Sequence, residues 1–455
     1  MSNPGDADAT PITSLGQLAD YIAEGCKPAT SFRVGTEHEK FGFRLADLAP
    51  PHYEPGGIGA LLEGIAASHG MPIEDEGRII GVKQGKSSIS LEPAGQLELS
   101  GAPLATLHET RTELETHLAE VKRVAAPLGL DFAPLGFHPT MRRDDMPWMP
   151  KGRYAVMRRY MPLVGSMGLD MMTRTCTVQA NLDYASEEDM RRKLRVALAL
   201  QPIATALFAN SPFTEGRPNG FLSYRAHVWT DTDNQRSGIP AVMFDEGFGF
   251  ERYVAWLIDE VPMYFVHRNG RYTDVAGQSF RRFMEGRVPE LAGEAATVGD
   301  FADHMTTAFT DVRLKRFLEM RGADAGRPAM MVAQSAFWVG LLYDQAALAA
   351  ALSLVRSQSW ADTIALRNTV PKRGLETPYR GGGALRRIAG EALDIARDGL
   401  RARDRHDGSG RDEAALLDPL HEIIDGAPTQ AEWWLERYRG AWNGDVTRIF
   451  REASN

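Results

Sequence analysis

RVGTEHEKFGF, residues 33–43, predicts an extended strand that carries two glutamates, Glu37 and Glu39. Side chains alternate between faces along a strand, so these two carboxylates point the same way. His38 lies between them on the opposite face. Because it faces the other way, His38 cannot share a set of metal ligands with Glu37 and Glu39, and we interpret it as structural. The stretch therefore indicates a strand with one acidic face.

The partner that we expect for this strand is ISLEPAGQLELS, residues 89–100. Read as one strand, it places Glu92 and Glu98 on the same face and its apolar side chains on the other. Glu92 and Glu98 share a face only if no bulge shifts the alternation of side chains at Pro93-Ala94-Gly95, where a bulge would most readily form. The two stretches together predict four carboxylates on neighbouring strands.

Carboxylates gathered in one pocket repel one another unless something compensates for their charge. They are then paired with basic groups, protonated, or bound to a hard metal such as Mg²⁺. A single Glu-x-Glu is more often a solvated strand face. Two such pairs, each beside glycine or an apolar strand face, favour a metal site.

The composition is that of an ordinary globular protein, with 455 residues, 43% hydrophobic and 24% charged. The net charge of −9, with no compensating basic block, argues against a partner made of nucleic acid. The length suits one large domain or two to three smaller ones. Because no change in composition marks a boundary, we expect a flexible tail at residues 1–12 and a single domain at 13–455 with a helical C-terminal part.

Two cysteines far apart in sequence, Cys26 and Cys176, indicate a reducing compartment and no disulfide framework. Residues 1–11 have neither the basic nor the apolar region of a secretion signal. The longest apolar run, residues 346–355, is too short to cross a bilayer. We therefore expect a cytoplasmic protein that has no membrane partner.

Strands and helices are predicted from two different periodicities. Alternating polar and apolar residues predict strands at 174–183, 221–230 and 314–322, and Asn269-Gly270 predicts a tight hairpin within 263–272. Helical patterns cover residues 15–24, 58–69, 104–126 and 186–210 and most of the chain from 328 onward. Strands in hairpins and helices in runs indicate an α+β fold with an antiparallel sheet, not a βαβ array.

The strand at residues 174–183 has one polar face, which includes Gln179 and Asn181 and suits the lining of a wet site. Cys176 lies on its apolar face, as a small buried hydrophobic residue and not a nucleophile. In the strand at 221–230, alternation places Arg225 beside Trp229. Glu319 and Arg321 share a face of the strand at 314–322.

Common catalytic motifs are missing from the sequence. GVKQGKS, residues 81–87, has three residues between its glycines where a P-loop has four, and it precedes a strand and not a helix. The sequence contains no GxSxG, HExxH or CxxC. A hard-metal site with nearby arginines instead suits phosphoryl transfer from a Mg-nucleotide. The acceptor could be a carboxylate, which arginine binds through two parallel hydrogen bonds.

Six longer segments carry a resemblance to a known family: GTEHEKFGF, SISLEPAGQLELSGAPL, MGLDMMTRTCTVQANLDY, LFANSPFTEGRPNGFLSYRAHVWTDTD, VPMYFVHRNGRY and RLKRFLEMRGAD. They resemble the plant-type branch of the glutamate–cysteine ligases, which plants share with many proteobacteria. The resemblance runs from about residue 13 to near the C-terminus, so residues 13–455 are expected to form one catalytic ligase domain.

The resemblance implies ATP-dependent condensation of the γ-carboxyl of L-glutamate with the amine of L-cysteine through γ-glutamyl phosphate, the first step of glutathione biosynthesis. It also implies the fold that this family shares with glutamine synthetase. In that fold a curved antiparallel sheet is packed by helices and holds Mg²⁺ in its concave funnel. Feedback inhibition by glutathione is left open.

The family's site residues are carried over by matching motifs. The resemblance implies these metal ligands: Glu37, Glu39, Glu92, Glu98, Glu319 and, more weakly, Gln179. Arg321 is expected to lie over the transferring phosphoryl group. Arg153 in KGRY and Arg225 in SYRAH are expected to hold glutamate. Tyr264 and Phe265 in VPMYF are expected to form an aromatic pocket.

One departure from the plant members concerns redox control. Val275 and Glu290 stand where one of their regulatory cysteine pairs would lie, so we expect neither activation by disulfide exchange nor redox-driven dimerisation. Two alternatives stay open. One is a γ-glutamyl ligase of the same family with another amine acceptor. The other is a catalytically silent metal- or nucleotide-binding regulator, against which the retention of the glutamates and Arg321 argues.

Overall fold

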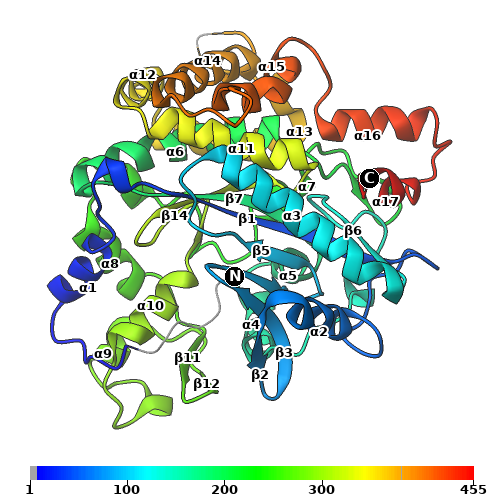
Figure 1. Cartoon of the computed structure of the whole chain (residues 1–455). Coiled ribbons are helices and arrows are strands. Elements are labelled where there is room, and N and C mark those ends of the chain that lie inside the picture. The colour runs from blue at the N-terminus through cyan, green and yellow to red at the C-terminus, as the bar shows by residue number, and fades with distance from the viewer. Residues whose placement is uncertain (1–7, 381, 455) are drawn as a thin grey trace.

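The computed structural model describes residues 8–380 and 382–454. Its centre is a nine-stranded sheet in the order β14-β15-β7-β1-β5-β4-β3-β2, in which β6 also pairs with β1 (Figure 1). Every pairing in it is antiparallel, as predicted. The strands are β1 (Val34–Arg44), β2 (Met71–Asp75), β3 (Arg78–Gln84), β4 (Ser87–Leu91), β5 (Leu97–Ser100), β6 (Leu130–Ala133), β7 (Thr177–Leu182), β14 (Val312–Leu314) and β15 (Leu318–Asp324).

Strand β1 organises the sheet because it is long enough to pair with three others. Residues 34–38 pair with β7, residues 37–40 with β5, and residues 41–44 with β6. Nearly all of its eleven residues are buried. Side chains on both faces of β1 are therefore enclosed, and any charge that it carries needs a partner.

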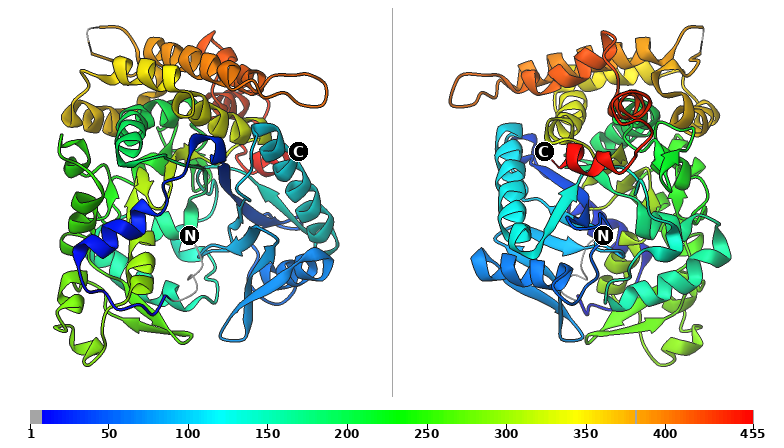
Figure 2. Two further views of the ribbon diagram at one scale, coloured as in Figure 1. Left: turned by 60° about the vertical axis from the view of Figure 1, so that its left-hand side comes forward. Right: turned by 90° about the vertical axis from the view of Figure 1, so that its right-hand side faces the viewer.

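Helices cover one face of the sheet in two layers (Figures 1 and 2). Helices α3 (Leu107–Ala125) and α11 (Pro328–Leu342) pack on the sheet. Helices α12 (Gln345–Val355), α14 (Leu385–Arg403) and α15 (Asp418–Ile424) lie outside α11, at the top of both figures. Helix α11 is buried from Met330 to Leu342, as an all-round apolar helix must be.

The remaining helices are α1 (Leu15–Ala23), α2 (Ile58–His69), α4 (Gly152–Val164), α5 (Gly168–Arg174), α6 (Glu187–Leu207), α7 (Tyr224–Val228), α8 (Phe250–Asp259), α9 (Phe280–Met284), α10 (Val298–Thr306), α13 (Trp360–Arg373), α16 (Gln430–Arg439) and α17 (Arg448–Ala453). Three two-stranded sheets complete the fold: β8 (Phe213–Thr214) with β9 (Arg217–Pro218), β10 (Ser237–Gly238) with β13 (Phe309–Thr310), and β11 (Phe265–Arg268) with β12 (Arg271–Asp274). Within the described ranges, no single helix is long and apolar enough to cross a membrane.

Local signals in the sequence placed several of these elements correctly. Ser14 and Ser186 accept hydrogen bonds from the amides of Gln17 and Asp189 and so cap α1 and α6. The predicted hairpin at residues 263–272 is confirmed as β11 and β12. Its turn residues Asn269 and Gly270 both have positive φ, as a tight turn of this type requires.

Residues 89–100 form a hairpin, β4 and β5, and not the single strand predicted. The amide of Glu92 donates to the carbonyl of Gln96 at 2.8 Å, so residues 93–95 make the turn. Pro93 has no amide proton to donate, and Gly95 takes a left-handed φ of +84°. These two residues therefore end the strand, and Glu92 lies at the edge of a turn.

Residues 221–230 are also corrected, because they contain the helix α7 where a strand was predicted. Ser223 accepts a hydrogen bond from the amide of Ala226 at 3.2 Å and so caps the helix. A short alternating pattern is ambiguous, and here the cap decides it. Arg225 consequently leaves from the first turn of a helix.

The N-terminal tail predicted at residues 1–12 falls partly outside the described residues, at 1–7. Residues 8–12 run beside 296–299, where the amide of Ile12 donates to Ala296 and the amide of Val298 donates to Thr10. Both cysteines are free, and Cys176 is buried as expected.

The turn between β4 and β5 provides a test of the fold. A Cβ atom at Gly95 would meet Met149 at 3.0 Å and Ile58 at 3.1 Å, in a backbone conformation that side chains disfavour. We expect Gly95→Ala to lower the free energy of unfolding by about 2–4 kcal/mol, measured by urea denaturation. Gly85→Ala is the matched control. Gly85 has a φ of +61° but no atom within 4 Å, so only the backbone cost of about 1–2 kcal/mol remains. Equal losses in the two variants would contradict the packing argument.

Candidate active site

Alternation along β1 separates two sets of polar side chains. On the helix-covered face, the hydroxyl of Thr36 lies 2.9 Å from that of Ser335 on α11. On the same face the Nζ atom of Lys40 lies 2.9 Å from His117 Nε2 on α3 and 3.2 Å from His38 Nδ1. His38 therefore faces away from Glu37 and Glu39, as predicted, and the two glutamates occupy the opposite face.

The strand register places the acidic residues in a row across that opposite face. Glu39 is directly opposite Glu98 on β5, and Glu37 is directly opposite Gln179 on β7. Cβ atoms of such pairs lie about 4.5–5.5 Å apart. Glu92 belongs to the turn that follows β4 and lines the same cavity as Glu39. The sheet thus brings together the four carboxylates that the sequence placed on two strands.

Burial and mutual repulsion disturb the protonation of this row. Burial, together with Glu92 and Glu98, raises the pKa of Glu39 to about 8. Burial, together with Glu319 and Glu98, also raises the pKa of Glu37. Each carboxylate accepts one hydrogen bond from β7: Glu39 from the amide of Thr177 at 2.9 Å and Glu37 from Asn181 Nδ2 at 2.8 Å. Glu37 and Glu39 are therefore hard to ionise, and an added cation would favour their charged form.

Glu319 is held differently, by basic side chains. Arg313 Nη2 donates to its Oε1 at 2.8 Å, and Arg321 Nη1 donates to its Oε2 at 2.7 Å. Burial would raise the pKa of the Glu319 carboxyl, but Arg313, Lys315 and Arg321 hold it well below its usual value. Arg321 Nη1 also donates to Gln179 Oε1 at 2.7 Å. Glu319 and Gln179 therefore fix the guanidinium of Arg321.

A β-bulge in β15 sets the direction of the Arg321 side chain. Glu319 pairs with Asn181 and Ala323 pairs with Val178, so four steps along β15 oppose three along β7. The extra residue falls at Arg321-Gly322, and the amide of Arg321 donates instead to the carbonyl of Asp311 at 3.0 Å. Such bulges re-aim side chains next to active sites.

The acidic row fits Mg²⁺ by its chemistry. Among residues 8–380 and 382–454, no three His, Cys, Asp or Glu side chains form a ready-made metal cage. Mg²⁺, however, is usually held by one or two carboxylates together with water and substrate phosphates. Carboxylates crowded on one buried face, two of which (Glu37 and Glu39) have a raised pKa, match that mode of binding. Glu37, Glu39, Glu92 and Glu98 are the residues that would hold such an ion.

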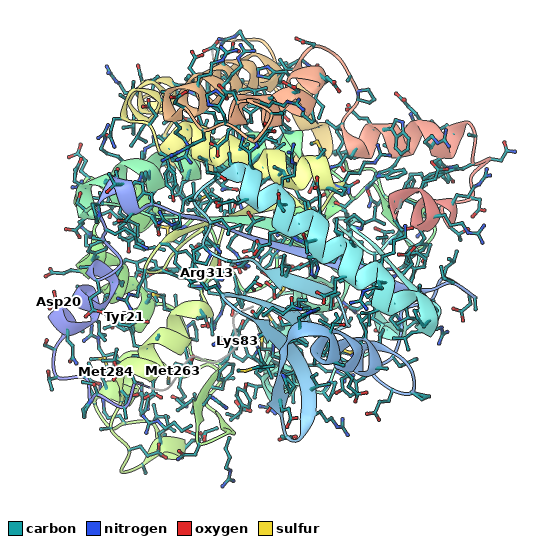
Figure 3. The ribbon with its side chains drawn as sticks, viewed as in Figure 1. Asp20, Tyr21, Lys83, Met263, Met284 and Arg313 are labelled. Atoms are coloured by element: carbon teal, nitrogen blue, oxygen red, sulfur yellow. The ribbon has the colours of Figure 1, made fainter. Side chains whose placement is uncertain are left out.

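Two small adjoining cavities lie beside the row, of about 40 and 30 Å³. Both are lined by Arg225, Trp229, Phe309 and Arg321, and the larger one also by Glu39, Glu92 and Gln179. A third cavity, of about 640 Å³, lies between α1, α10 and the β11–β12 turn. Its walls include Lys315 and Tyr21. Figure 3 labels Tyr21 and, outside this cavity wall, Arg313 of β14. None of the four row carboxylates lines that third cavity.

The predicted arginines both reach the neighbourhood of the row. Arg225 is buried, and its Nη2 donates to the carbonyl of Arg321 at 3.0 Å. Among the described residues, its Nε and the Nε1 of Trp229 have no hydrogen-bond acceptor, so both donors are available to a ligand. Arg153 is buried in the first turn of α4. Burial tends to lower its pKa, but Tyr154 and Glu92 outweigh this and leave the pKa raised.

The two predicted aromatic residues are not brought to the cavity walls. Tyr264 is fully buried, its hydroxyl lies 3.3 Å from Asp233 Oδ2, and the guanidinium of Arg236 lies 3.7 Å from its ring centre. Phe265 begins β11 and packs edge-to-face on Tyr272. Neither residue lines the two cavities beside the acidic row.

Sequence reasoning missed three basic residues near the site. Lys151 is buried, its Nζ has no acceptor in the described part of the chain, and burial together with Arg153 lowers its pKa to about 7. Arg313 lies on β14, six residues before Glu319, and Arg367 reaches the smaller cavity from α13. Lys151 belongs to the KGRY segment that also contains Arg153, so the sequence did carry a local signal for it. Arg367 is remote in sequence and has no local signal.

The fold and site define a family of ligases, and comparison with known proteins identifies it. The model of the glutamate-cysteine ligase family 2 (GCS2) matches residues 33–452. The chain belongs to this family, which confirms the resemblance inferred from the sequence.

Two curated relatives and one solved structure agree with this result. The chain is 52% identical to the chloroplastic glutamate–cysteine ligases of Brassica juncea and Arabidopsis thaliana. In each case the match covers 98% of this chain, with 85% and 83% of the relative. The fold resembles the crystal structure of glutamate–cysteine ligase from Francisella tularensis in complex with AMP. The TM-score is 0.56 at 11% identity, over 93% of this chain and 88% of the other.

The relatives also correct one expectation. They are named as chloroplastic proteins, which contradicts the cytoplasmic location predicted from the sequence. Two cysteines that do not pair indicate a reducing compartment without saying which one.

The acidic row gives the next prediction. Replacing Glu39 by Gln keeps the size of the side chain and removes a charged hard ligand. We expect a folded protein whose ligase activity falls at least about a hundredfold and needs more Mg²⁺, measured by titrating Mg²⁺ in a phosphate-release assay. Glu63→Gln, on the exposed side of α2, is the control and should match the wild type. An unchanged Mg²⁺ dependence in Glu39→Gln would show that Glu39 is not a ligand.

Proposed function

We propose that this chain ligates the γ-carboxyl of L-glutamate to the amine of L-cysteine, the first step of glutathione biosynthesis, using ATP and Mg²⁺. The observation that carries the proposal is the buried acidic row, whose members Glu39 and Glu92 line one cavity together with Arg225 and Arg321. Family membership supports the choice of substrates. Carboxylates that hold Mg²⁺, beside arginines that hold anions, are the parts that phosphoryl transfer needs.

The proposed reaction proceeds in two steps. An oxygen of the glutamate γ-carboxylate attacks the γ-phosphorus of ATP, and ADP leaves with the electrons of the broken P–O bond. The cysteine amine then attacks the acyl carbon of γ-glutamyl phosphate, inorganic phosphate leaves, and the nitrogen loses a proton. Mg²⁺, when bound, neutralises phosphate charge.

The protein's own residues supply position and charge. Arg321, fixed by Glu319 and Gln179, lies at the cavity wall where it can stabilise the charge of the transferring group. Arg313 keeps Glu319 ionised from the other side. In this arrangement Glu319 and Gln179 act through Arg321, and their direct ligation of a metal stays a prediction.

Glutamate would lie against the arginines of the same cavity. Arg225 lines this cavity and has an Nε without an acceptor among the described residues, and Arg153 interacts with the charge of Glu92. A guanidinium can bind a carboxylate through two hydrogen bonds and so orient it. The aromatic pocket of Tyr264 and Phe265 and inhibition by glutathione stay predictions. Residues 13–455 would act as one catalytic domain, because the candidate residues span 37–321 and the later helices pack on the same sheet.

The reaction itself is tested with the purified chain. Phosphate release is measured with ATP, Mg²⁺ and glutamate, and with cysteine and other amines as acceptors in turn. We expect cysteine to give the highest kcat/KM. A higher value with another amine would favour a different γ-glutamyl ligase. A lack of turnover with every acceptor would indicate a silent regulator.

Arg225 is tested by Arg225→Lys, which keeps the charge but loses the fork of donors. Losing a bidentate, charge-assisted contact costs about 1.5–3 kcal/mol, so kcat/KM for glutamate should fall roughly ten- to a hundredfold through KM. The KM for ATP should barely change. The control is Arg437→Lys, because Arg437 makes a bidentate contact to Glu452 near the C-terminus. An unchanged KM for glutamate, or equal losses for both substrates, would rule out the assignment.

A further inference from the structure

Asp324, the last residue of β15, is a buried carboxylate outside the acidic row. Its Oδ2 accepts hydrogen bonds from the amide of Asn210 at 2.8 Å and the hydroxyl of Ser211 at 2.6 Å. Its Oδ1 accepts from the hydroxyl of Ser223 at 2.8 Å. A Cβ atom at Gly136 would lie 2.4 Å from its Cγ, so the neighbouring backbone packs directly on the carboxylate. The side chain is therefore confined to one position.

The two serines pass this constraint on to helix α7. An ionised carboxylate only accepts hydrogen bonds, so each hydroxyl must give its proton to Asp324. The lone pairs that remain accept from the helix: Ser211 Oγ from the amide of Arg225 at 3.1 Å, and Ser223 Oγ from the amide of Ala226 at 3.2 Å. One carboxylate thus orients both hydroxyls that bind the first turn of α7.

The guanidinium of Arg225 is tied to the same strand. Its Nη2 donates to the carbonyl of Arg321, three residues before Asp324 on β15. Burial lowers the pKa of Arg225, and the charges of Asp324 and Glu39 oppose that shift. Strand β15 therefore fixes the backbone of Arg225 at one end and its head group at the other.

We propose that Asp324 is a positioning residue for glutamate binding, which sets the place of Arg225 through the hydroxyls of Ser211 and Ser223. The inference rests on the proposed function, in which Arg225 contacts glutamate. Asp324 itself lines neither cavity beside the acidic row, so it acts through Arg225 and not by touching the substrate.

The test is Asp324→Asn, which keeps the shape but replaces one acceptor by an NH₂ donor. That donor would meet a serine hydroxyl or the amide of Asn210, so at least one hydrogen bond of the set is lost. We expect the KM for glutamate to rise about tenfold, because a small misplacement of a binding group is costly. The KM for ATP should change by less than about twofold, since the nucleotide does not contact Arg225 in the proposed function.

A double-mutant cycle with Arg225→Lys identifies the route. If Asp324 acts through Arg225, the double variant should have a KM for glutamate close to that of the worse single variant. Independent effects that multiply would overturn the inference. An effect of Asp324→Asn on the KM for glutamate when Arg225→Lys has none would overturn it as well.

Glu413→Gln is the matched control for a structural role. Glu413 is a fully buried carboxylate that accepts from the amide of Leu107 at 2.7 Å and from Arg403 Nε at 3.2 Å, away from the site. We expect this variant to lower the Tm and leave the KM for glutamate unchanged. If Asp324→Asn behaves in the same way, Asp324 is structural and the inference fails.

Ser211→Ala and Ser223→Ala keep the test decisive if Asp324→Asn does not fold. Each removes one link between Asp324 and α7, and each should raise the KM for glutamate more than the KM for ATP. Unchanged values in both folded variants would overturn the inference. Failure of the proposed function would look different, because the wild type would then release no phosphate with glutamate and cysteine.

Discussion

The structure depends on the charge balance of one buried sheet face. Glu37 and Glu39 lie on one face of β1, beside Glu98 of β5, and burial and repulsion between carboxylates raise the pKa of Glu37 and Glu39. Glu319, on β15 of the same sheet, is ionised because Arg313 and Arg321 donate hydrogen bonds to it directly. The sheet therefore contains one carboxylate that arginines keep ionised and two whose ionisation burial opposes. That difference separates the part that fixes an arginine from the part that suits a metal.

The opposite face of β1 shows how the same strand is held in place. Lys40 is buried between His38 and His117, and burial lowers its pKa to about 7 although Cys176, Glu98 and Glu39 oppose the shift. These contacts join β1 to α3, and the contact of Thr36 with Ser335 joins it to α11. A strand packed on both faces cannot slip in register without moving every side chain to the wrong face. The positions of Glu37 and Glu39 follow from that packing.

The C-terminal helices reach the site through hydrogen bonds as well as through packing. Arg367 of α13 bonds to Asp311 and to the carbonyl of Trp229, at the wall of the smaller cavity. Trp434 of α16 donates to Asn210 at 2.7 Å, and the amide of Asn210 donates to Asp324. Segments more than a hundred residues from the acidic row thus hold the residues that shape the cavity.

The sequence by itself determined what depends on neighbouring residues. Backbone alternation put Glu37 and Glu39 on one face and His38 on the other, Asn269-Gly270 produced the hairpin, and Ser14 and Ser186 began their helices. The quoted segments also indicated the family. The turn at Gly95 and the cap at Ser223, which begins the helix of Arg225, depend on neighbouring residues as well. Tertiary structure alone decided that Glu37 lies opposite Gln179 on β7. It also decided that Glu319 bonds to Arg313, and that Asp324 and Arg367 support the site. Local geometry repeats every two or 3.6 residues and can be read along the chain. The partners of a buried charge are chosen by register and packing between distant segments, and no local pattern encodes them.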